Sequence, residues 1–323
     1  GDIKEMSFHG KDIKIFAASA SRRTAEQIAQ CLDLPMGKSE VGTFSDGEIS
    51  VSLLDSVRGS DCFIVQSTCA PVNNNLMELL IMMDAMKRAS AARITAVMPY
   101  FGYARQDRKA KAHDPITAKL VADLLTTAGA NRILTMDLHA SQIQGFFNIP
   151  VDHLLGVPLL ASHIKERISG HTDEYVVVSP DLGSVTRARN FAERIGCPLA
   201  IVDKRRKKAN VCEVMNIIGR VKGKKVLLVD DVVDTAGTLC NAAAALMENG
   251  ASQVNACATH AVLSGPAISR IKDSPIKELV LLDTIPIPQE KLLPNMTVLS
   301  VAPLFAEAIE RIYEDKPVSP LFR

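Results

Sequence analysis

The chain has 323 residues, 47% of them hydrophobic, which is more than one domain usually carries, so we expect two domains. Its 37 Lys and Arg residues balance 36 Asp and Glu residues, and the net charge of +1 argues against nucleic acid or an anionic membrane as partner. The seven cysteines lack a CxxC spacing, which argues against a zinc site or a disulfide framework and fits a reduced cytoplasmic protein. The most apolar stretch, Leu76–Met86, is too short and too charged to span a bilayer, and the first residues show no signal-peptide pattern.

Short runs of β-branched residues alternate with helical patterns along the chain. In chain order, strands are expected at Ile13–Ala17, Cys62–Gln66, Arg93–Met98, Arg132–Met136, Tyr175–Ser179, Leu199–Val202, Lys225–Val229, Val254–Ala258 and Leu279–Leu282. Helices are expected at Asn74–Ser90, Ile116–Thr127, Val185–Arg194 and Thr238–Asn249. This alternation predicts an α/β fold with doubly wound parallel sheets and with ligands at the carboxyl ends of the strands.

An internal repeat suggests that one α/β domain has been duplicated. Each copy contains a helix, a glycine cap, a strand and then a histidine. The matching residues lie 121 positions apart, and they are Thr117 and Thr238, Gly129 and Gly250, and His139 and His260. Glycine after a helix is common, but three matched landmarks favour duplication. We therefore expect one domain over residues 1–155 and a second over residues 156–323.

The sharpest functional signal is the segment KKVLLVDDVVDTAGTL at residues 224–239. We expect an apolar strand to end at Asp230 and Asp231, and a tight loop to lead into a helix. Small residues let backbone N–H groups approach a phosphate, whose charge a helix N-terminus favours. The paired acids suit sugar hydroxyls or Mg²⁺. The predicted sugar-phosphate site is Asp230, Asp231, Asp234, Thr235, Ala236, Gly237 and Thr238; the alternative is an ordinary junction with acidic caps.

The first copy has a longer, basic loop at residues 100–114 in place of the acidic one. Arg105, Gln106 and Asp107 would suit a triphosphate, because a guanidinium presents a fork of donors. A solvated basic turn is the simpler interpretation of Arg108 and Lys109. No Walker A sequence occurs, and no GxGxxG follows a strand, which argues against a P-loop kinase and a dinucleotide enzyme.

Two further segments carry candidate residues. Phe44, Asp46 and Glu48 alternate in TFSDGEIS, and an extended segment would place a ring and two acceptors on one face. The alternative there is an edge strand with one buried Phe. The five cations of residues 204–208 most simply form a solvated loop, and nucleic-acid contact is a second interpretation. Because the net charge is near zero and no RNA-binding motif occurs, we expect no nucleic acid.

The segment at residues 224–239 resembles the phosphoribosyl-diphosphate-binding motif of the type I phosphoribosyltransferase fold. Together with PYFGYARQDRK, TMDLHASQIQGFF, VVVSPD, DKRRKKAN, TFSDGE and LSGPAISR, it makes the whole chain similar to class I ribose-phosphate diphosphokinases. The resemblance implies two duplicated, Rossmann-like phosphoribosyltransferase domains, the first on the ATP side and the second binding ribose phosphate. It implies transfer of the diphosphoryl group of Mg-ATP to the C1 hydroxyl of ribose 5-phosphate, giving phosphoribosyl diphosphate and AMP for nucleotide biosynthesis.

The resemblance also implies roles for single residues. The Arg105–Asp107 segment contacts ATP, while His139 and Asp181 hold Mg²⁺. Lys204 and Arg206, in a mobile catalytic loop, act on the transferring phosphoryl groups.

The resemblance further implies an assembly and a regulatory surface. Phe44, Asp46 and Glu48 reach the adenine of a neighbouring subunit, which implies a homo-oligomer, a hexamer built from dimers. A regulatory phosphate would bind near Ser56, Arg58 and Ser319.

Four positions depart from common family residues. Leu182 and Ser184 stand where relatives commonly carry a Gly–Gly pair after a smaller residue, and a left-handed backbone at position 184 would cost serine about 1 kcal/mol. His113 replaces a common Arg and Pro317 an occasional Ser, so regulation by phosphate and ADP is left open.

Two rival functions share parts of this pattern. A base-adding phosphoribosyltransferase would use the same sugar loop, but it would not need the Arg105, His139 and Lys204 motifs or two domain copies. A non-catalytic regulatory subunit of the same family should have lost site residues, and none is lost. The residues do not identify a general base.

Overall fold

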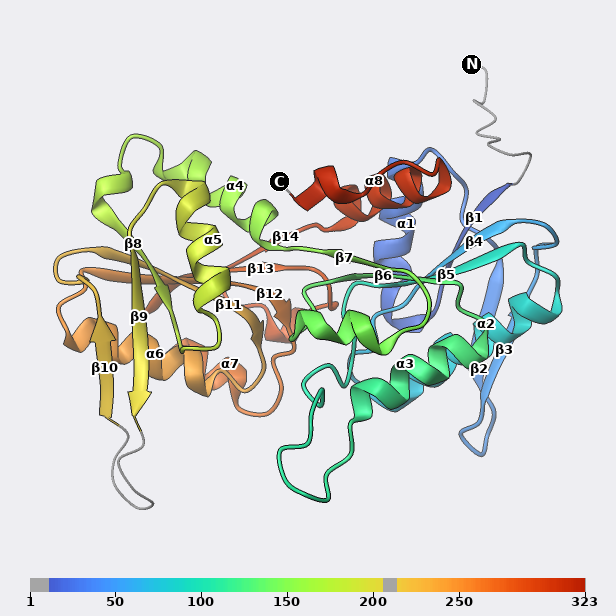
Figure 1. Cartoon of the computed structure of the whole chain (residues 1–323), viewed down its shortest axis with the longest axis horizontal. Coiled ribbons are helices and arrows are strands. Elements are labelled where there is room, and N and C mark those ends of the chain that lie inside the picture. Colours follow the sequence, from blue (N-terminus) through green and yellow to red (C-terminus); the bar gives the residue numbers. More distant parts are fainter. Residues whose placement is uncertain (1–11, 206–213, 323) are drawn as a thin grey trace. The chain divides into compact units, whose positions relative to one another are not determined.

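The computed structural model describes residues 12–205 and 214–322, and it divides into two compact units (Figure 1). The first unit comprises Gly1–Leu155, Thr284–Pro286 and Ser300–Arg323, and the second Gly156–Asp283 and Ile287–Leu299. From the sequence, residues 300–323 were expected in the second domain, whereas the described part of this segment, residues 300–322, belongs to the first unit. The reason is helix α8 (Ala302–Tyr313), which packs against helix α1 (Arg22–Cys31).

The first unit is built on a five-stranded parallel sheet with the strand order β1-β4-β5-β6-β7. The strands are β1 (Ile13–Ala17), β4 (Asp61–Val65), β5 (Arg93–Met98), β6 (Arg132–Met136) and β7 (Val151–Leu154). Helices α2 (Val72–Arg88) and α3 (Thr117–Ala128) pack together on the face opposite α1 and α8 (Figure 1). Because both faces are covered, a strand such as β4 is buried at all five residues and is largely apolar.

A separate antiparallel hairpin and three short helices complete the first unit. The hairpin consists of β2 (Ser39–Thr43) and β3 (Ile49–Leu53). The 3-10 helices are η1 (Ser19–Ser21), η2 (Ser141–Phe146) and η5 (Ser319–Phe322).

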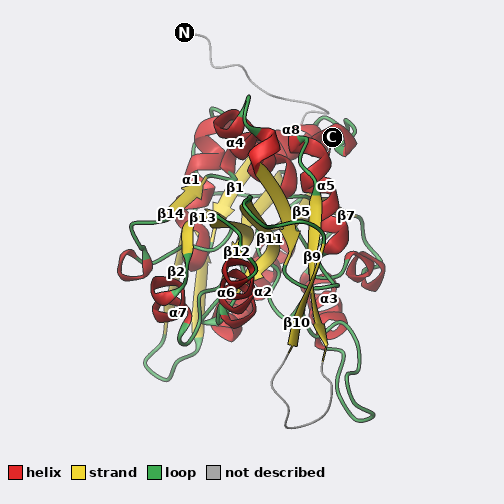
Figure 2. Ribbon diagram, turned by 90° about the vertical axis from the view of Figure 1, so that its left-hand side faces the viewer, coloured by secondary structure: helices red, strands yellow, loops and turns green. Residues whose placement is uncertain are grey.

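The second unit is built on a seven-stranded sheet with the order β10-β9-β8-β11-β12-β13-β14. The strands are β8 (Tyr175–Ser179), β9 (Leu199–Arg205), β10 (Val214–Ile218), β11 (Lys225–Val233), β12 (Gln253–Ala261), β13 (Ile276–Leu282) and β14 (Met296–Leu299). Its helices are α4 (Val157–Ile168), α5 (Val185–Ile195), α6 (Gly237–Glu248), α7 (Ala267–Asp273), η3 (Thr172–Glu174) and η4 (Gln289–Lys291). Figure 2 shows the sheets and their covering helices from the side.

The predicted α/β fold with parallel sheets is confirmed, with one edge that the sequence did not indicate. Strand β10 pairs antiparallel to β9, and only eight residues separate the two strands along the chain, fewer than a parallel crossover connection needs. The repeat corresponds to two similar parallel units, β5-α3-β6 and β11-α6-β12. Gly129 and Gly250 follow their helices at φ values of 127° and 92°, a region that glycine adopts readily. Among the described residues, no helix is long and apolar enough to cross a membrane.

Candidate active site

In the second unit, the acid pair lies within strand β11 and not after it. The sequence predicted a strand over Lys225–Val229 with the two acids at its end, but Asp230 still pairs with Ala258 of β12, and the ladder continues to Val233. A short loop then leads to helix α6, whose N-cap residue, Ala236, is left-handed at φ 64° and ψ 7°. A non-glycine residue in this conformation carries backbone strain, which is typical of ligand-binding turns.

The loop between β11 and α6 has the form of an anion cradle. The first helical hydrogen bond of α6 runs from Cys240 N–H to the Ala236 carbonyl (3.0 Å), so the N–H groups before it are available at the N-terminus. Thr235 and Thr238 are exposed beside these groups. Arg270, on α7, donates from Nη1 to the Thr235 carbonyl (3.1 Å) and adds a positive charge at the rim.

Neighbouring backbone braces the same loop from its other side. Ser264 N–H donates to the Asp234 carbonyl (3.0 Å), and the Ser264 hydroxyl donates to the Asp234 carboxylate. At Gly237, a Cβ atom would lie 3.1 Å from Arg270 Nη1, so a larger residue would press on that guanidinium. The cradle is therefore held in shape before any ligand binds.

The acid pair is buried and electrostatically coupled. Asp230 Oδ1 accepts hydrogen bonds from Asp231 N–H (2.8 Å) and from the Ser184 hydroxyl (3.2 Å). Burial first, and the charge of Asp231 second, raise the pKa of Asp230 to about 8. Arg187 Nη1 lies 3.9 Å from Asp231 Oδ1 and supplies a cation to that second acid. The raised pKa favours the protonated form of Asp230, which can donate as well as accept.

The loop after β8 brings Asp181 to the same group of acids. Asp181 Oδ1 accepts the Ser184 N–H (2.9 Å), and the Ser179 hydroxyl donates to the Asp181 carbonyl (2.6 Å). Ser184 has a φ of −97°, so the anticipated cost of a left-handed serine does not arise. Leu182 is 61% exposed and packs little.

Lys204 lies near the end of β9, where the sequence analysis expected a mobile loop. Its backbone pairs with Met215 across the antiparallel β9–β10 ladder, which holds this part of the chain in place. Arg206, the second predicted catalytic cation, lies outside the described residues, so its place stays a prediction.

In the first unit, the basic loop of residues 100–114 begins in a tightly packed segment. A Cβ at Gly102 would lie 2.3 Å from the Thr68 carbonyl oxygen, so only glycine fits there. Phe101 is buried and meets Phe147 edge to face, with ring centroids 5.9 Å apart. Tyr103 donates its hydroxyl to Asn73 Oδ1. The loop therefore leaves a rigid base before it reaches its charged part.

The predicted ATP segment follows this base. Gln106 Oε1 accepts from the Thr117 hydroxyl (2.6 Å), and the Gln106 carbonyl accepts Ala118 N–H (3.1 Å), which ties the segment to the start of α3. Gln142 Nε2 lies 3.4 Å from Asp107 Oδ2. Arg105 is exposed, as a residue that meets a ligand's phosphates would be.

The two repeat-related histidines differ in exposure. His139 is exposed three residues after β6 ends, whereas His260 is buried inside β12. Of these two histidines, only His139 is accessible to a ligand.

The segment Phe44–Glu48 is a turn and not the extended segment that the sequence analysis assumed. It joins β2 to β3, with Phe44 N–H donating to the Glu48 carbonyl (2.7 Å) and Gly47 at φ 95°. The rule of alternating faces therefore does not apply to these residues. Phe44 is nevertheless 57% exposed, which removes the alternative of a buried ring on an edge strand.

The remaining predicted residues are individually exposed. Ser56 and Arg58 lie between β3 and β4, and Ser319 begins η5. Their regulatory role stays a prediction.

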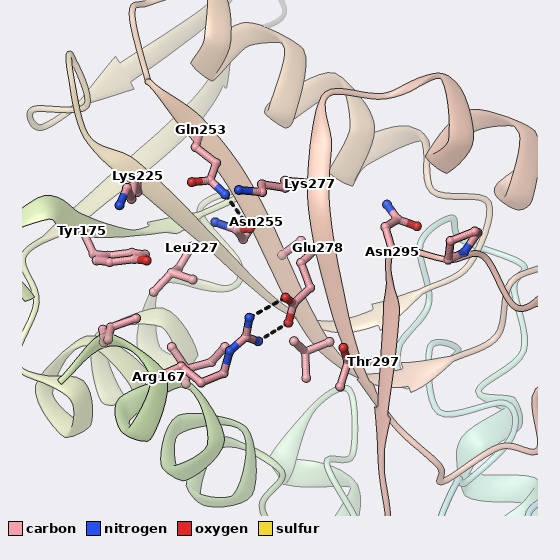
Figure 3. Close-up of a pocket in the computed structure, with 15 residues that line it drawn as sticks. Arg167, Tyr175, Lys225, Leu227, Gln253, Asn255, Lys277, Glu278, Asn295 and Thr297 are labelled. Carbon is pink, nitrogen blue, oxygen red and sulfur yellow. Dashed lines mark hydrogen bonds and ion pairs between the residues drawn. The ribbon is translucent and has the colours of Figure 1, made fainter. Parts of the chain in front are cut away.

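A hollow of about 400 Å³ lies in the second unit at the amino-terminal edge of its sheet (Figure 3). Its charged groups largely neutralise one another. Arg167 binds Glu278 with both guanidinium nitrogens, and Lys225 binds Glu174 at 2.7 Å. The acid pair and the anion cradle lie toward the opposite ends of the same strands, so this hollow is not the candidate active site.

Comparison with known proteins identifies the family. Residues 13–129 match the N-terminal domain of ribose phosphate pyrophosphokinase, and residues 206–323 match the phosphoribosyl synthetase-associated domain. The chain is 66% identical over 317 residues to a ribose-phosphate pyrophosphokinase of Caldanaerobacter subterraneus, covering 98% of this chain and 100% of that protein. The chain belongs to the ribose-phosphate pyrophosphokinase family.

Further relatives agree with this assignment. A ribose-phosphate pyrophosphokinase of Clostridium perfringens is 64% identical over 318 residues, with 98% and 100% of the two chains covered. A crystal structure of phosphoribosylpyrophosphate synthetase from Mycobacterium smegmatis matches with a TM-score of 0.89 and 46% identity, covering 94% of this chain and 100% of that one. The chain is thus an enzyme, a ribose-phosphate pyrophosphokinase.

Four residues of the sugar-phosphate site were assigned no ligand role in the sequence analysis. Ser264 and Arg270 both lie in LSGPAISR, a segment used there only to support the family resemblance. Ser184 was treated as a departure and not as a donor to an acid. Arg187, on α5, carried no local signal, because its partner Asp231 is remote in sequence.

Proposed function

We propose that the chain is a cytoplasmic enzyme that transfers the diphosphoryl group of Mg-ATP to the C1 hydroxyl of ribose 5-phosphate. The products are phosphoribosyl diphosphate, used in nucleotide biosynthesis, and AMP. The observation that carries this proposal is the single β11–α6 connection, which joins a buried acid pair to an anion cradle at a helix N-terminus. A sugar needs the acids and its phosphate needs the cradle, so a phosphorylated sugar satisfies both.

Each end of ribose 5-phosphate has its own partners in this proposal. Asp230 and Asp231 exchange hydrogen bonds with the ribose hydroxyls. The N-terminal N–H groups of α6, with the hydroxyls of Thr235 and Thr238, bind the 5-phosphate. Arg270 adds a cation beside that phosphate.

ATP binds through residues of the first unit in the same proposal. Arg105 forks across phosphate oxygens, and Gln106 and Asp107 supply further hydrogen bonds. Phe44, Asp46 and Glu48 bind the adenine held by a neighbouring subunit. The exposure of the Phe44 ring supports this role. A site shared in this way requires a homo-oligomer, and the family resemblance implies a hexamer.

The proposal includes a Mg²⁺ ion that arrives with the nucleotide. The described residues contain no cluster of three or more potential metal ligands, and Mg²⁺ commonly takes few protein ligands and keeps its waters. We assign one ligand to His139, which is exposed, and one to Asp181, which is partly exposed. When bound, Mg²⁺ neutralises charge on the ATP phosphates.

The transfer itself depends on positioning and charge. The ribose C1 oxygen forms a bond to the β-phosphorus of ATP, and the bond from that phosphorus to the bridging α–β oxygen breaks. AMP leaves with the bridging oxygen, and the proton of the C1 hydroxyl is released. Lys204 and Arg206 stabilise the charge that develops on the transferring group.

The products decide between this proposal and its rivals. Incubation with Mg-ATP, labelled at the γ-phosphate, and ribose 5-phosphate should give unlabelled AMP and a labelled sugar diphosphate in equal amounts. Stoichiometric ADP would indicate an ordinary kinase. Consumption of phosphoribosyl diphosphate with a purine or pyrimidine base, releasing diphosphate, would indicate a base-adding phosphoribosyltransferase. No turnover in a folded protein would indicate a regulatory subunit.

A further inference from the structure

Strand β7 continues to hold the chain of the first unit after β6 has ended. Strand β6 ends at Met136, and the next two N–H groups both bond to β7. Asp137 N–H donates to the Leu154 carbonyl (2.9 Å), and Leu138 N–H donates to the imidazole Nε2 of His153 (2.9 Å). Immediately before His139, the acceptor on β7 is thus a side chain and no longer a backbone carbonyl.

The same imidazole also lies beside the chain after His139. His153 Nδ1 lies 3.3 Å from the side-chain amide of Gln144 in helix η2. That amide in turn donates to the Ser141 carbonyl (3.1 Å). His153 therefore contacts both sides of the exposed loop that carries His139.

The chemistry of the Leu138 contact defines the state of the imidazole. A backbone N–H needs a lone pair, so the Nε2 that accepts from Leu138 is unprotonated. Leu138 is only 3% exposed, so water does not readily replace the acceptor. A buried N–H without a partner is costly, and the segment would move to find one.

The backbone of this loop also depends on being held from outside. Asp137 has a φ of 40°, a left-handed conformation that a non-glycine residue adopts only when its surroundings impose it. The bonds from β7 to Asp137 and Leu138 provide that constraint. Without the His153 acceptor, the loop would lose the bond from Leu138 N–H to β7.

We propose that His153 is a positioning residue whose imidazole fixes the loop of residues 137–144, so that His139 is presented to the nucleotide and its metal ion. The inference deepens the proposed function, because it rests on the role assigned there to His139. In this proposal, His153 acts through the loop and not by touching a substrate.

Two substitutions separate an acceptor role from simple packing. His153→Leu keeps bulk and removes the acceptor, whereas His153→Gln places a carbonyl oxygen near the position of Nε2. Hydrogen exchange of the full chain without nucleotide or metal, resolved to the Leu138 amide, gives a readout that does not depend on turnover. We expect this amide to exchange at least about tenfold faster in His153→Leu and near the wild-type rate in His153→Gln.

The kinetic effects of the two variants should follow the same order as their effects on Leu138 amide exchange. In His153→Leu, kcat/KM for ATP should fall by about tenfold, with the KM for ribose 5-phosphate changed by less than about twofold. His153→Gln should stay within about threefold of wild type. His171→Leu removes an exposed histidine in the second unit and should change none of these values.

The results distinguish this inference from the function on which it rests. The inference would be overturned if the Leu138 amide exchanged at the wild-type rate in His153→Leu, or if the Leu and Gln variants lost kcat/KM for ATP equally. Neither result would change what the AMP assay says about the proposed function. ADP production by the wild type would overturn the proposed function, while the exchange result would still report on the His153 contact. Thermal unfolding of each variant checks that the first unit stays folded.

Discussion

Asp230 makes the stability of the protein depend on pH in an unusual direction for a carboxylic acid. Its pKa rises from the ordinary 3.8 to about 8, mainly through burial and then through the charge of Asp231. Between about pH 4 and pH 8, the folded chain keeps a proton that the unfolded chain has released, so the free energy of unfolding falls as pH rises.

Asp230→Asn should remove this dependence. Relative to wild type, the free energy of unfolding of the variant should rise by up to about 1.4 kcal/mol per pH unit in that window. Denaturant unfolding at several pH values between about 5 and 8 measures the difference. Asp231→Asn is the matched control. It removes the neighbouring charge and lowers the pKa of Asp230, so it should narrow the pH range over which the free energy of unfolding falls. Parallel pH profiles for wild type and Asp230→Asn would contradict the assignment.

The identity of the acids could be predicted from sequence, but their protonation could not. Asp230 and Asp231 stand out because two carboxylates follow an apolar run. Their burial depends on β12 beside them and on Ser184, which lies 46 residues away in the chain. No local pattern contains that contact.

Two cations at and after the end of strand β9, Lys204 and Arg206, are proposed to stabilise the transition state. The ladder of this strand with β10 holds Lys204, while Arg206 follows two residues later in the chain. Lys204→Ala and Arg206→Ala should each lower kcat about a hundredfold, or ~3 kcal/mol, with a much smaller change in KM, because the contacts matter most as charge develops.

An exposed lysine elsewhere in the second unit provides the control for these two variants. Lys277→Ala, on β13, should keep wild-type turnover. Steady-state kinetics with circular dichroism measures the effect. Intact kcat with weaker RNA or DNA retention in the Lys204 and Arg206 variants would support the nucleic-acid alternative instead.

The β2–β3 hairpin offers a matched pair of exposed apolar side chains. Phe44 and Leu54 are each 57% exposed, but only Phe44 is proposed to stack on adenine. Phe44→Ala should raise the KM for ATP about tenfold, since stacking of a base on an aromatic ring is worth about 1–3 kcal/mol. Leu54→Ala should leave it unchanged.

The dependence of activity on the oligomeric state is a second test of the proposed Phe44 contact with adenine. If the ring serves a neighbouring subunit, specific activity should also fall on dilution to verified monomers. Full activity in a monomer, or equal KM values for the two variants, would contradict a site shared between subunits.

The strands and helices that the sequence predicted are those with long apolar runs or clear periodicity, such as β5 and α2. The missed strands have a physical reason. Strands β7 and β14 have only four residues each, β2 is largely polar, and β3 (ISVSL) alternates apolar and polar residues and so lacks the continuous apolar run of the parallel strands. Helix α1 has the sequence RRTAEQIAQC, in which Ile28 is the one large aliphatic residue. The assignment of α8 to the first unit was not predictable either, because chain order does not indicate which core a terminal helix joins.

One buried ion pair should account for much of the attachment of α8 to the first unit. Arg93 binds Asp61 with two nitrogens, at 3.0 and 2.5 Å, and donates from Nη2 to the Ile312 carbonyl of α8 (3.2 Å). Asp61 is 3% exposed, so Arg93→Ala would leave a buried carboxylate without its cation. We expect a loss of about 3 kcal/mol or more in the free energy of unfolding, together with faster hydrogen exchange in α8.

Helix α2 carries a surface pair that serves as the matched control. Arg88 pairs with Asp84 at 2.8 Å, but the two side chains are 79% and 50% exposed. Arg88→Ala should therefore cost no more than about 0.5 kcal/mol, because solvent screens the pair. Denaturant unfolding and peptide-resolved hydrogen exchange compare the two variants. Equal destabilisation, or unchanged exchange of α8 in Arg93→Ala, would mean that apolar packing of α8 against α1 holds the terminal helix without help from this pair.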